Sequence, residues 1–79
     1  MEYAIVTFSH ESFGSADIKI SRKLSAKKCI INILDALKID IASLDLVFCL
    51  KAESSGVFLN QNETLEQYDI YDGEILEVL

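Results

Sequence analysis

The chain has 79 residues, 51% of them hydrophobic and 25% charged, and its formal net charge at pH 7 is −6. This length fits one domain, residues 1–79, which would bury roughly 60% of the surface of the unfolded chain. The absence of Pro and of any apolar run near the ~20 residues that cross a bilayer predicts a compact soluble domain without direct membrane insertion. The acidic balance argues against nucleic acid as a partner, because such binding begins with a basic surface.

The first residues bear on where the protein works. The start, MEYAIVTF, lacks a basic segment ahead of an apolar one, so it is not a secretory signal. We therefore expect a cytoplasmic protein. Two cysteines are too few for a disulfide framework, and Cys29 on a helix and Cys49 on the outer sheet face are expected to be free thiols.

The N-terminal quarter of the chain predicts a hairpin. Apolar residues alternate from Tyr3 to Phe8, as they do in a strand with one buried face. Turn-forming residues follow at His10–Ser15, and alternation resumes at Asp17–Ile20. No His, Cys or carboxylate cluster is available as a partner for His10, so we interpret this residue as part of a solvated loop.

A change of period marks the next element. From Ser25 to Lys38 apolar residues recur at i, i+3, i+4 and i+7, which predicts a helix with Ser25 as its N-cap. Lys27 and Lys28 fall in the first turn, where positive charge opposes the helix dipole at a cost of about a few tenths of a kcal/mol. That cost is either tolerated or retained for a partner.

The second half of the chain predicts three more strands. Alternation over Asp45–Lys51 indicates a third strand, and Val57–Leu59 indicates a short fourth one. A single irregular or 3₁₀ turn is expected at Leu65–Ile70, followed by a last strand at Ile75–Leu79. The element order is therefore ββαββ, a turn, then β.

The closing segment resembles a known fold. The pattern T-L-x-x-Y-x-I-x-x-x-x-x-L-x-V-L at Thr64–Leu79 is similar to the end of ubiquitin-like β-grasp domains. The resemblance implies an α+β fold, ββαββ-turn-β, with one helix packed across one face of a mixed sheet. It also implies that the first and last strands lie parallel at the centre, and that the Tyr68 hydroxyl binds a backbone group near the fourth strand.

Three motifs narrow this resemblance. The segments VTF at Val6–Phe8, K-x-x-I-x-x-x-L-D-x-L at Lys27–Leu37 and Y-x-I-x-D-G-x-I-L at Tyr68–Leu76 are similar to the small YukD/EsaB proteins of Gram-positive bacteria. Those proteins are ubiquitin-like accessory components of the type VII secretion machinery. The resemblance implies a cytoplasmic, non-enzymatic docking subunit that makes non-covalent contacts with cytoplasmic domains of membrane components, such as the secretion ATPase.

A covalent modifier or a sulfur carrier is the alternative function, because such proteins share this fold. They require a flexible tail that ends in Gly-Gly, since any side chain would clash in the narrow site of the activating enzyme. The last residues here are Val78 and Leu79, which are expected to be held in the sheet. This ending disfavours the alternative.

No catalytic, cofactor or metal site is predicted. The three glycines are scattered singly, so they form no phosphate-binding loop. Two separated cysteines and one His give no recognisable metal-ligand spacing. Glu74 and Glu77 would point to opposite faces of a strand, which prevents them from acting as an acid/base pair.

Two surfaces are candidate protein-binding sites. If the helix covers one side of the sheet, alternation leaves an apolar stripe on the other side, interrupted by Glu77. The alternatives are that the stripe is ordinary surface or the contact of a homodimer. The stripe consists of Tyr3, Ile5, Val47, Cys49, Ile75 and Leu79. The second candidate is Lys27 with Lys28, because every charge between Lys19 and Lys28 is basic while those from Glu53 to Glu77 are acidic.

The same periodicities predict the hydrophobic core. Its expected members are Val6, Phe8, Ile18, Ile20, Ile30, Ile33, Leu34, Leu37, Leu46, Phe48, Leu50, Leu65, Leu76 and Val78.

Overall fold

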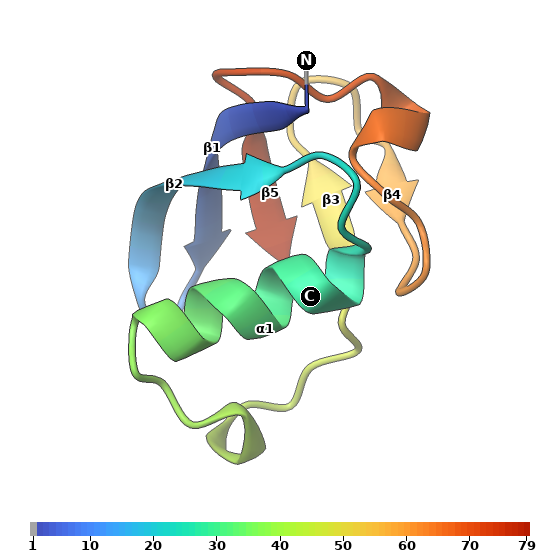
Figure 1. Cartoon of the computed structure of the whole chain (residues 1–79). Helices are drawn as coiled ribbons and strands as arrows, with labels where there is room; N and C mark the ends of the chain where they lie inside the picture. Colours follow the sequence, from blue (N-terminus) through green and yellow to red (C-terminus); the bar gives the residue numbers. More distant parts are fainter. Residues whose placement is uncertain (1) are drawn as a thin grey trace.

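A computed structural model describes residues 2–79 as one sheet with a helix across one of its faces (Figure 1). The elements in chain order are β1 (Tyr3–His10), β2 (Gly14–Ser21), α1 (Ala26–Ala36), η1 (Ile41–Ser43), β3 (Leu50–Ala52), β4 (Phe58–Leu59), η2 (Glu66–Tyr68) and β5 (Ile75–Val78), where η1 and η2 are 3₁₀ helices. None of the helices in this range is long and apolar enough to cross a membrane.

The sheet is mixed, with the strand order β2-β1-β5-β3-β4. β1 and β5 are parallel neighbours at its centre, with Thr7 paired with Ile75 and Phe8 with Leu76. All other strand pairs are antiparallel. This arrangement confirms the β-grasp order that the resemblance implied, and it places the first and last strands side by side (Figure 1).

The hairpin at the start of the chain is longer than the alternation predicts. β1 and β2 pair from Tyr3↔Ser21 to His10↔Gly14. The turn between them closes through Phe13, whose N–H donates to the His10 carbonyl at 3.2 Å. Gly14 has a φ of 78°, a conformation that costs a glycine little and most other residues more.

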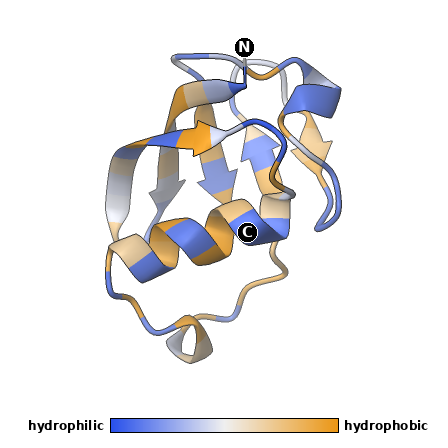
Figure 2. Ribbon diagram, viewed as in Figure 1, coloured by the Kyte–Doolittle hydropathy of each residue, from blue (hydrophilic) through white to orange (hydrophobic). Residues whose placement is uncertain are grey.

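The helix forms as predicted at its start and ends earlier than predicted. The Ser25 side chain accepts a hydrogen bond from the Lys28 N–H at 3.3 Å, which confirms the N-cap. Alternating apolar and polar bands along α1 are visible in Figure 2, and the apolar side faces the sheet. Lys38 adopts a positive φ of 58° and stops the helix. Leu37 is 39% exposed, so its assignment to the core was wrong.

The third strand is much shorter than predicted. Phe48 has a φ of 61°, which no continuous strand tolerates. The N–H groups of Val47, Phe48 and Cys49 instead all point to the carbonyl oxygen of Leu79, at 3.2, 2.9 and 3.4 Å. Strand pairing starts only at Leu50, so the expected alternation over residues 45–49 is broken.

Most of the predicted core is confirmed. Val6, Phe8, Leu50, Leu76 and Val78 are at most 2% exposed, and the buried helix residues face them. Ile18, Leu46 and Phe48 are only partly buried and pack against the edge of the core, which corrects their assignment. The periodicities missed six further buried residues: Ala4, Ala26, Cys29, Ala52, Leu59 and Ile70.

Among the described residues, Arg22 is the one charged residue that is buried, with 4% exposure. Its Nε donates to the Ile70 carbonyl at 2.7 Å, and its guanidinium lies 4.2 Å from the centre of the Tyr71 ring. Its own carbonyl accepts from the Glu66 N–H at 3.0 Å. Arg22 therefore ties the end of β2 to the η2 segment, with its charge compensated by a carbonyl and an aromatic face.

Tyr68 packs against the core, but its hydroxyl has a different partner from the one expected. It donates to the Glu63 carboxylate and not to a backbone group. This hydrogen bond, followed by the Asn60 N–H, lowers the pKa of Glu63 below its ordinary value of 4.5. The same bond is the main cause that raises the pKa of Tyr68 above its ordinary value of 10.0.

Leu76→Ala tests the strand register. Leu76 is completely buried on the helix side of β5, so we expect the free energy of unfolding to fall by about 2 to 5 kcal/mol in chemical denaturation. Ile75→Ala is the matched control, because Ile75 lies on the opposite face and is 40% exposed. An equal loss for the two variants would contradict the register.

Tyr68→Phe tests the Tyr68–Glu63 bond through its pH dependence. The lowered pKa of Glu63 means that its contribution is complete above pH 4.5 and is lost as the pH falls through the folded-state pKa. The raised pKa of Tyr68 means that its contribution is complete below pH 10.0 and is lost as the pH rises through the folded-state pKa. We expect the variant to melt at a lower temperature than the unmodified protein near neutral pH, with the difference shrinking at both extremes.

The control for this experiment is Tyr71→Phe, which removes a hydroxyl from an exposed tyrosine. Its melting temperature is expected to follow that of the unmodified protein at every pH. A Tyr68→Phe difference that stays constant across the pH range would contradict the assigned bond.

Candidate partner-binding surface

The face of the sheet opposite α1 is not covered by any element within residues 2–79 and is here called the open face. Strand alternation and cross-strand pairing assign side chains to it from every strand. Its residues are Tyr3, Ile5, Thr7 and Ser9 of β1, Ser15, Asp17, Lys19 and Ser21 of β2, Lys51 of β3, Phe58 of β4, and Ile75 and Glu77 of β5.

Three apolar side chains lie at one end of the open face. Tyr3, Ile5 and Ile75 are 49%, 53% and 40% exposed. Ile75 is paired with Thr7, so Ile5 lies diagonally across from it on the neighbouring strand. The parallel pairing of β1 and β5 therefore brings together two isoleucines that are seventy residues apart in the sequence, as predicted for this pair.

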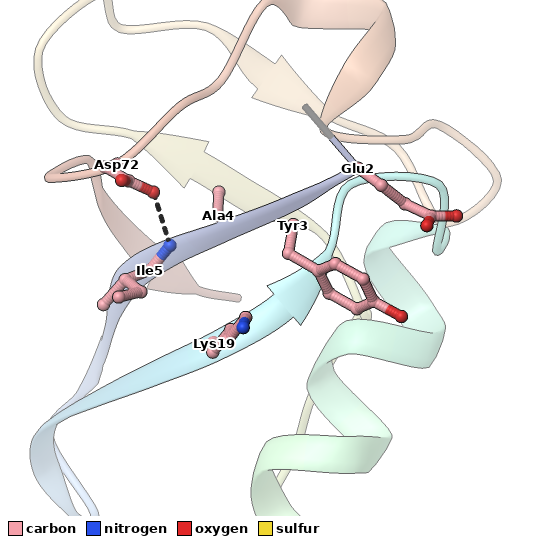
Figure 3. A pocket seen from close by; sticks show the side chains of 6 residues that line it. All are labelled: Glu2, Tyr3, Ala4, Ile5, Lys19 and Asp72. Carbon is pink, nitrogen blue, oxygen red and sulfur yellow. Dashed lines mark hydrogen bonds between the residues drawn. The ribbon is translucent and has the colours of Figure 1, made fainter.

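A hollow of about 320 Å³ borders this apolar group (Figure 3). Asp72, in the turn before β5, accepts the Ile5 N–H at 2.8 Å and fixes the turn to β1. The Lys19 ammonium from β2 lies 5.4 Å from the centre of the Tyr3 ring. The rim of the hollow thus offers an aromatic ring, an aliphatic side chain and a cation. Its remaining lining residues are Glu2 and Ala4.

The other end of the open face is more polar. Glu77 is half-buried and stands between Ser9 and Lys51 on the neighbouring strands. The Lys51 ammonium lies 5.6 Å from the centre of the Phe58 ring, which is 55% exposed. Phe58 was missed by the sequence reasoning, although alternation in the fourth strand against the buried Leu59 would have placed it outside.

The part of the predicted stripe at residues 47, 49 and 79 lies in or beside the irregular segment around Phe48. Val47 is 60% exposed, but it lies in the irregular segment before Phe48, where strand alternation does not fix its direction. Cys49 and Leu79 are only partly exposed, and the Leu79 N–H donates to the Cys49 carbonyl at 2.9 Å. Val47 and Cys49 were assigned to the stripe by the alternation of the third strand, which the positive φ at Phe48 interrupts, whereas Leu79 was assigned by the alternation of the last strand.

Lys27 and Lys28 lie on the helix, away from the open face. Both side chains are exposed, and the Lys27 ammonium lies 5.4 Å from the centre of the Phe48 ring. Arg22, which belongs to the same basic stretch, is buried, while Lys23 pairs with Glu2 at 3.9 Å. The basic residues between Lys19 and Lys28 are therefore spread over separate surfaces and do not form one patch.

Several carboxylates near the end of the chain accept hydrogen bonds from other parts of the protein. Glu63 accepts the Asn60 N–H at 2.8 Å, and Asp72 accepts that of Ile5. Glu74 accepts from the Ser54 N–H at 3.3 Å and from the Ser54 hydroxyl. These carboxylates hold turns together, which reduces the negative surface that a partner could meet.

Within residues 2–79, no group of three His, Cys, Asp or Glu side chains is placed to hold a metal ion. The His10 ring stacks on Phe13 with 5.8 Å between ring centres, and its Nδ1 accepts the Ser12 N–H at 3.0 Å.

The chain is similar in sequence to curated bacterial proteins. It is 33% identical over 72 residues to the type VII secretion system accessory factor EsaB of Staphylococcus aureus strain Newman, an alignment that covers 91% of this chain and 88% of EsaB. The EsaB proteins of strains COL and MRSA252 align with the same identity and coverage. No protein-family model matches the chain.

Solved structures with the same fold are ubiquitin-like. A protein designed on the basis of ubiquitin matches with a TM-score of 0.72 at 14% identity, covering 99% of this chain and 88% of the designed one. The C-terminal ubiquitin-like domain of mouse tubulin-specific chaperone e matches with a TM-score of 0.62 at 14% identity, covering 98% of this chain and 84% of that domain. The fold is therefore a ubiquitin-like β-grasp.

Thiol labelling tests the placement of the two cysteines. Cys29 is completely buried, and this burial raises the pKa of its thiol to about 12. Cys49 is partly exposed. We expect iodoacetamide at pH 8 to modify Cys49 in the folded protein and to leave Cys29 unmodified, as measured by mass spectrometry of the digested protein, because the thiolate is the reactive form. Both should react in denaturant, and rapid modification of folded Cys29 would contradict the packing of α1.

Proposed function

Because the chain belongs to the family of the type VII secretion accessory factor EsaB, we propose that it is a non-enzymatic docking subunit of a type VII secretion system. It acts in the cytoplasm through non-covalent contacts with cytoplasmic domains of the membrane components, among them the secretion ATPase. Its ubiquitin-like fold serves as a rigid carrier of a contact surface.

The observation that supports docking is the apolar end of the open face. Tyr3, Ile5 and Ile75 present aliphatic and aromatic atoms on a sheet face that no other described element covers. Apolar side chains gathered on one exposed surface are typical of protein interfaces, where aromatic anchors contribute most of the affinity. Lys19 and Glu77 border this group with charges of both signs, which would fix the orientation of a partner.

The backbone of the last described residues belongs to the sheet. Val78 pairs with Leu50, and the Leu79 carbonyl oxygen accepts three backbone N–H groups. Residues held in this way support the shape of the open face that β5 helps to form.

Lys27 and Lys28 are a second candidate contact on a different side of the molecule. They stand at the start of α1 without an acidic residue in the same turn. Their charges are unfavourable to the helix dipole, and a partner's carboxylates at this position would offset the cost. Docking through both surfaces would place the domain between two parts of the machinery.

The experiment is affinity purification of the tagged full chain from cells that contain the secretion system, with chemical cross-linking and quantification of the captured membrane components. We expect Ile5→Asp combined with Ile75→Asp to weaken capture by about fivefold or more, which corresponds to ~1 kcal/mol. Lys27→Glu with Lys28→Glu and, separately, Val47→Asp test whether contact extends to the helix and to the irregular segment.

The matched control is Leu37→Asp. Leu37 is 39% exposed, but it lies at the end of α1, away from the open face of the sheet. It should capture partners as well as the unmodified protein does. Each variant is checked for its melting temperature. A folded Ile5→Asp, Ile75→Asp variant with full capture and full secretion would contradict docking through the open face, and adducts that survive denaturation would contradict the non-covalent mode.

A further inference from the structure

β2 is an outer strand of the sheet with one unpaired edge. It pairs with β1 along its whole length, from Gly14 to Ser21, and no described strand lies on its other side. It contains no Pro and is one of the two longest strands. An open edge of this length is a template for pairing with another strand.

The backbone groups on the free edge belong to alternate residues. The Arg22 N–H donates to the Glu2 carbonyl at 2.7 Å, which makes Arg22 and Glu2 a hydrogen-bonded pair at the end of the β1–β2 ladder. Because such pairs alternate along antiparallel strands, the even-numbered residues of β2 bond to β1 and the odd-numbered ones point away. The outward-pointing residues are Ser15, Asp17, Lys19 and Ser21.

The hydrogen bonds that β1 makes on its other side, toward β5, agree with this alternation. The Thr7 N–H donates to the Glu74 carbonyl, and the Ile5 carbonyl accepts from Gly73, both at 2.9 Å. Odd-numbered residues of β1 thus bond toward β5, so its even-numbered residues bond toward β2. The assignment of the free groups on β2 is therefore supported from two directions.

We propose that this chain forms a two-fold symmetric dimer in which the β2 strands of two copies pair antiparallel, with Ile18 opposite Ile18 of the second copy. In this register Asp17 lies opposite the second copy's Lys19, and by symmetry Lys19 lies opposite the second copy's Asp17. Both residues present outward N–H and C=O groups, so both pairs form hydrogen bonds. The two sheets would join into one continuous sheet.

The two charges select this register. β2 carries one acidic and one basic side chain, Asp17 and Lys19, on the same face of the strand. The nearest other registers that still pair outward-pointing residues are centred on residue 17 or on residue 19. The first places Asp17 opposite Asp17 of the second copy, and the second places Lys19 opposite Lys19. Like charges directly opposite each other are destabilising, whereas the proposed register makes two attractive pairs.

The apolar side of β2 also fits a second copy. Ala16 and Ile18 pack against the edge of the core but remain partly exposed. On the two-fold axis, Ile18 and its symmetry mate form a non-hydrogen-bonded pair, the arrangement in which facing side chains come closest. The proposed dimer would therefore finish the burial of Ile18, which the helical side of the monomer covers only in part.

The proposed interface is small and its dimer is weak. The Ser21 carbonyl already accepts from the Leu24 N–H at 3.3 Å, so the ladder depends mainly on the residues between Ser15 and Lys19. A contact of one strand edge falls in the class of interfaces that form transiently. Association is therefore measured at high subunit concentration.

Sedimentation equilibrium of the full chain, from about 10 μM to about 1 mM, measures the association. Asp17→Lys and Lys19→Asp each create two like-charge pairs, and we expect each to raise the dimer dissociation constant by about tenfold or more. The double variant Asp17→Lys, Lys19→Asp restores two opposite-charge pairs in the same register, so its dissociation constant should return to within about threefold of the original.

Hydrogen exchange followed by NMR provides a second measurement that needs no variant. The Asp17 and Lys19 amides should gain protection as the concentration rises, while those of Ile18 and Ile20, which bond to β1, should be protected throughout. A monomer at every concentration, a dimer that ignores the single substitutions, or a double variant that fails to recover would overturn the proposal. Melting temperatures of all three variants establish that each compared protein is folded.

Discussion

The parallel contact between β1 and β5 is the constraint on which the rest of the molecule depends. It joins the two ends of the described chain through hydrogen bonds such as Thr7 N–H to the Glu74 carbonyl. A parallel pair cannot be closed by a tight turn, so everything between these strands serves as the connection. The hairpin extends the sheet on one side, β3 and β4 extend it on the other, and α1 covers one face of the result.

The buried Arg22 and the carboxylates that hold the turns of this small domain have hydrogen-bond partners within the protein. Arg22 is buried, yet it donates to the Ile70 carbonyl and lies over the Tyr71 ring. The carboxylates of Glu63 and Asp72 accept hydrogen bonds from neighbouring backbone groups. An unpaired polar group in such a core would cost about 1 to 3 kcal/mol, which a domain of this size cannot spare. Much of the charge in the sequence therefore supports the fold.

The position of α1 on one face of the sheet explains which surfaces are free to contact other proteins. α1 uses its apolar side for the core and leaves the opposite sheet face free, so Ile5 and Ile75 become neighbours on an open surface. Lys27 and Lys28 stay on the far side with the helix. The edge of β2 is a third surface, recognised by main-chain groups and by one pair of charges. Its side chains Asp17 and Lys19 also border the open face, whereas Lys27 and Lys28 lie apart from both.

The sequence by itself determined the elements whose cause is local. Alternation placed β1 and the face of Ile5, the helical period and Ser25 placed the start of α1, and Gly14 marked the hairpin turn. The neighbourhood of Ile5 and Ile75 came from the resemblance to ubiquitin-like domains, because a pairing across seventy residues leaves no local pattern. Only the tertiary structure decided the break at Phe48, the burial of Arg22 and the bond from Tyr68 to Glu63. Each of these depends on a partner brought in by the packed sheet, such as the Leu79 carbonyl, which accepts the N–H groups of both Val47 and Phe48.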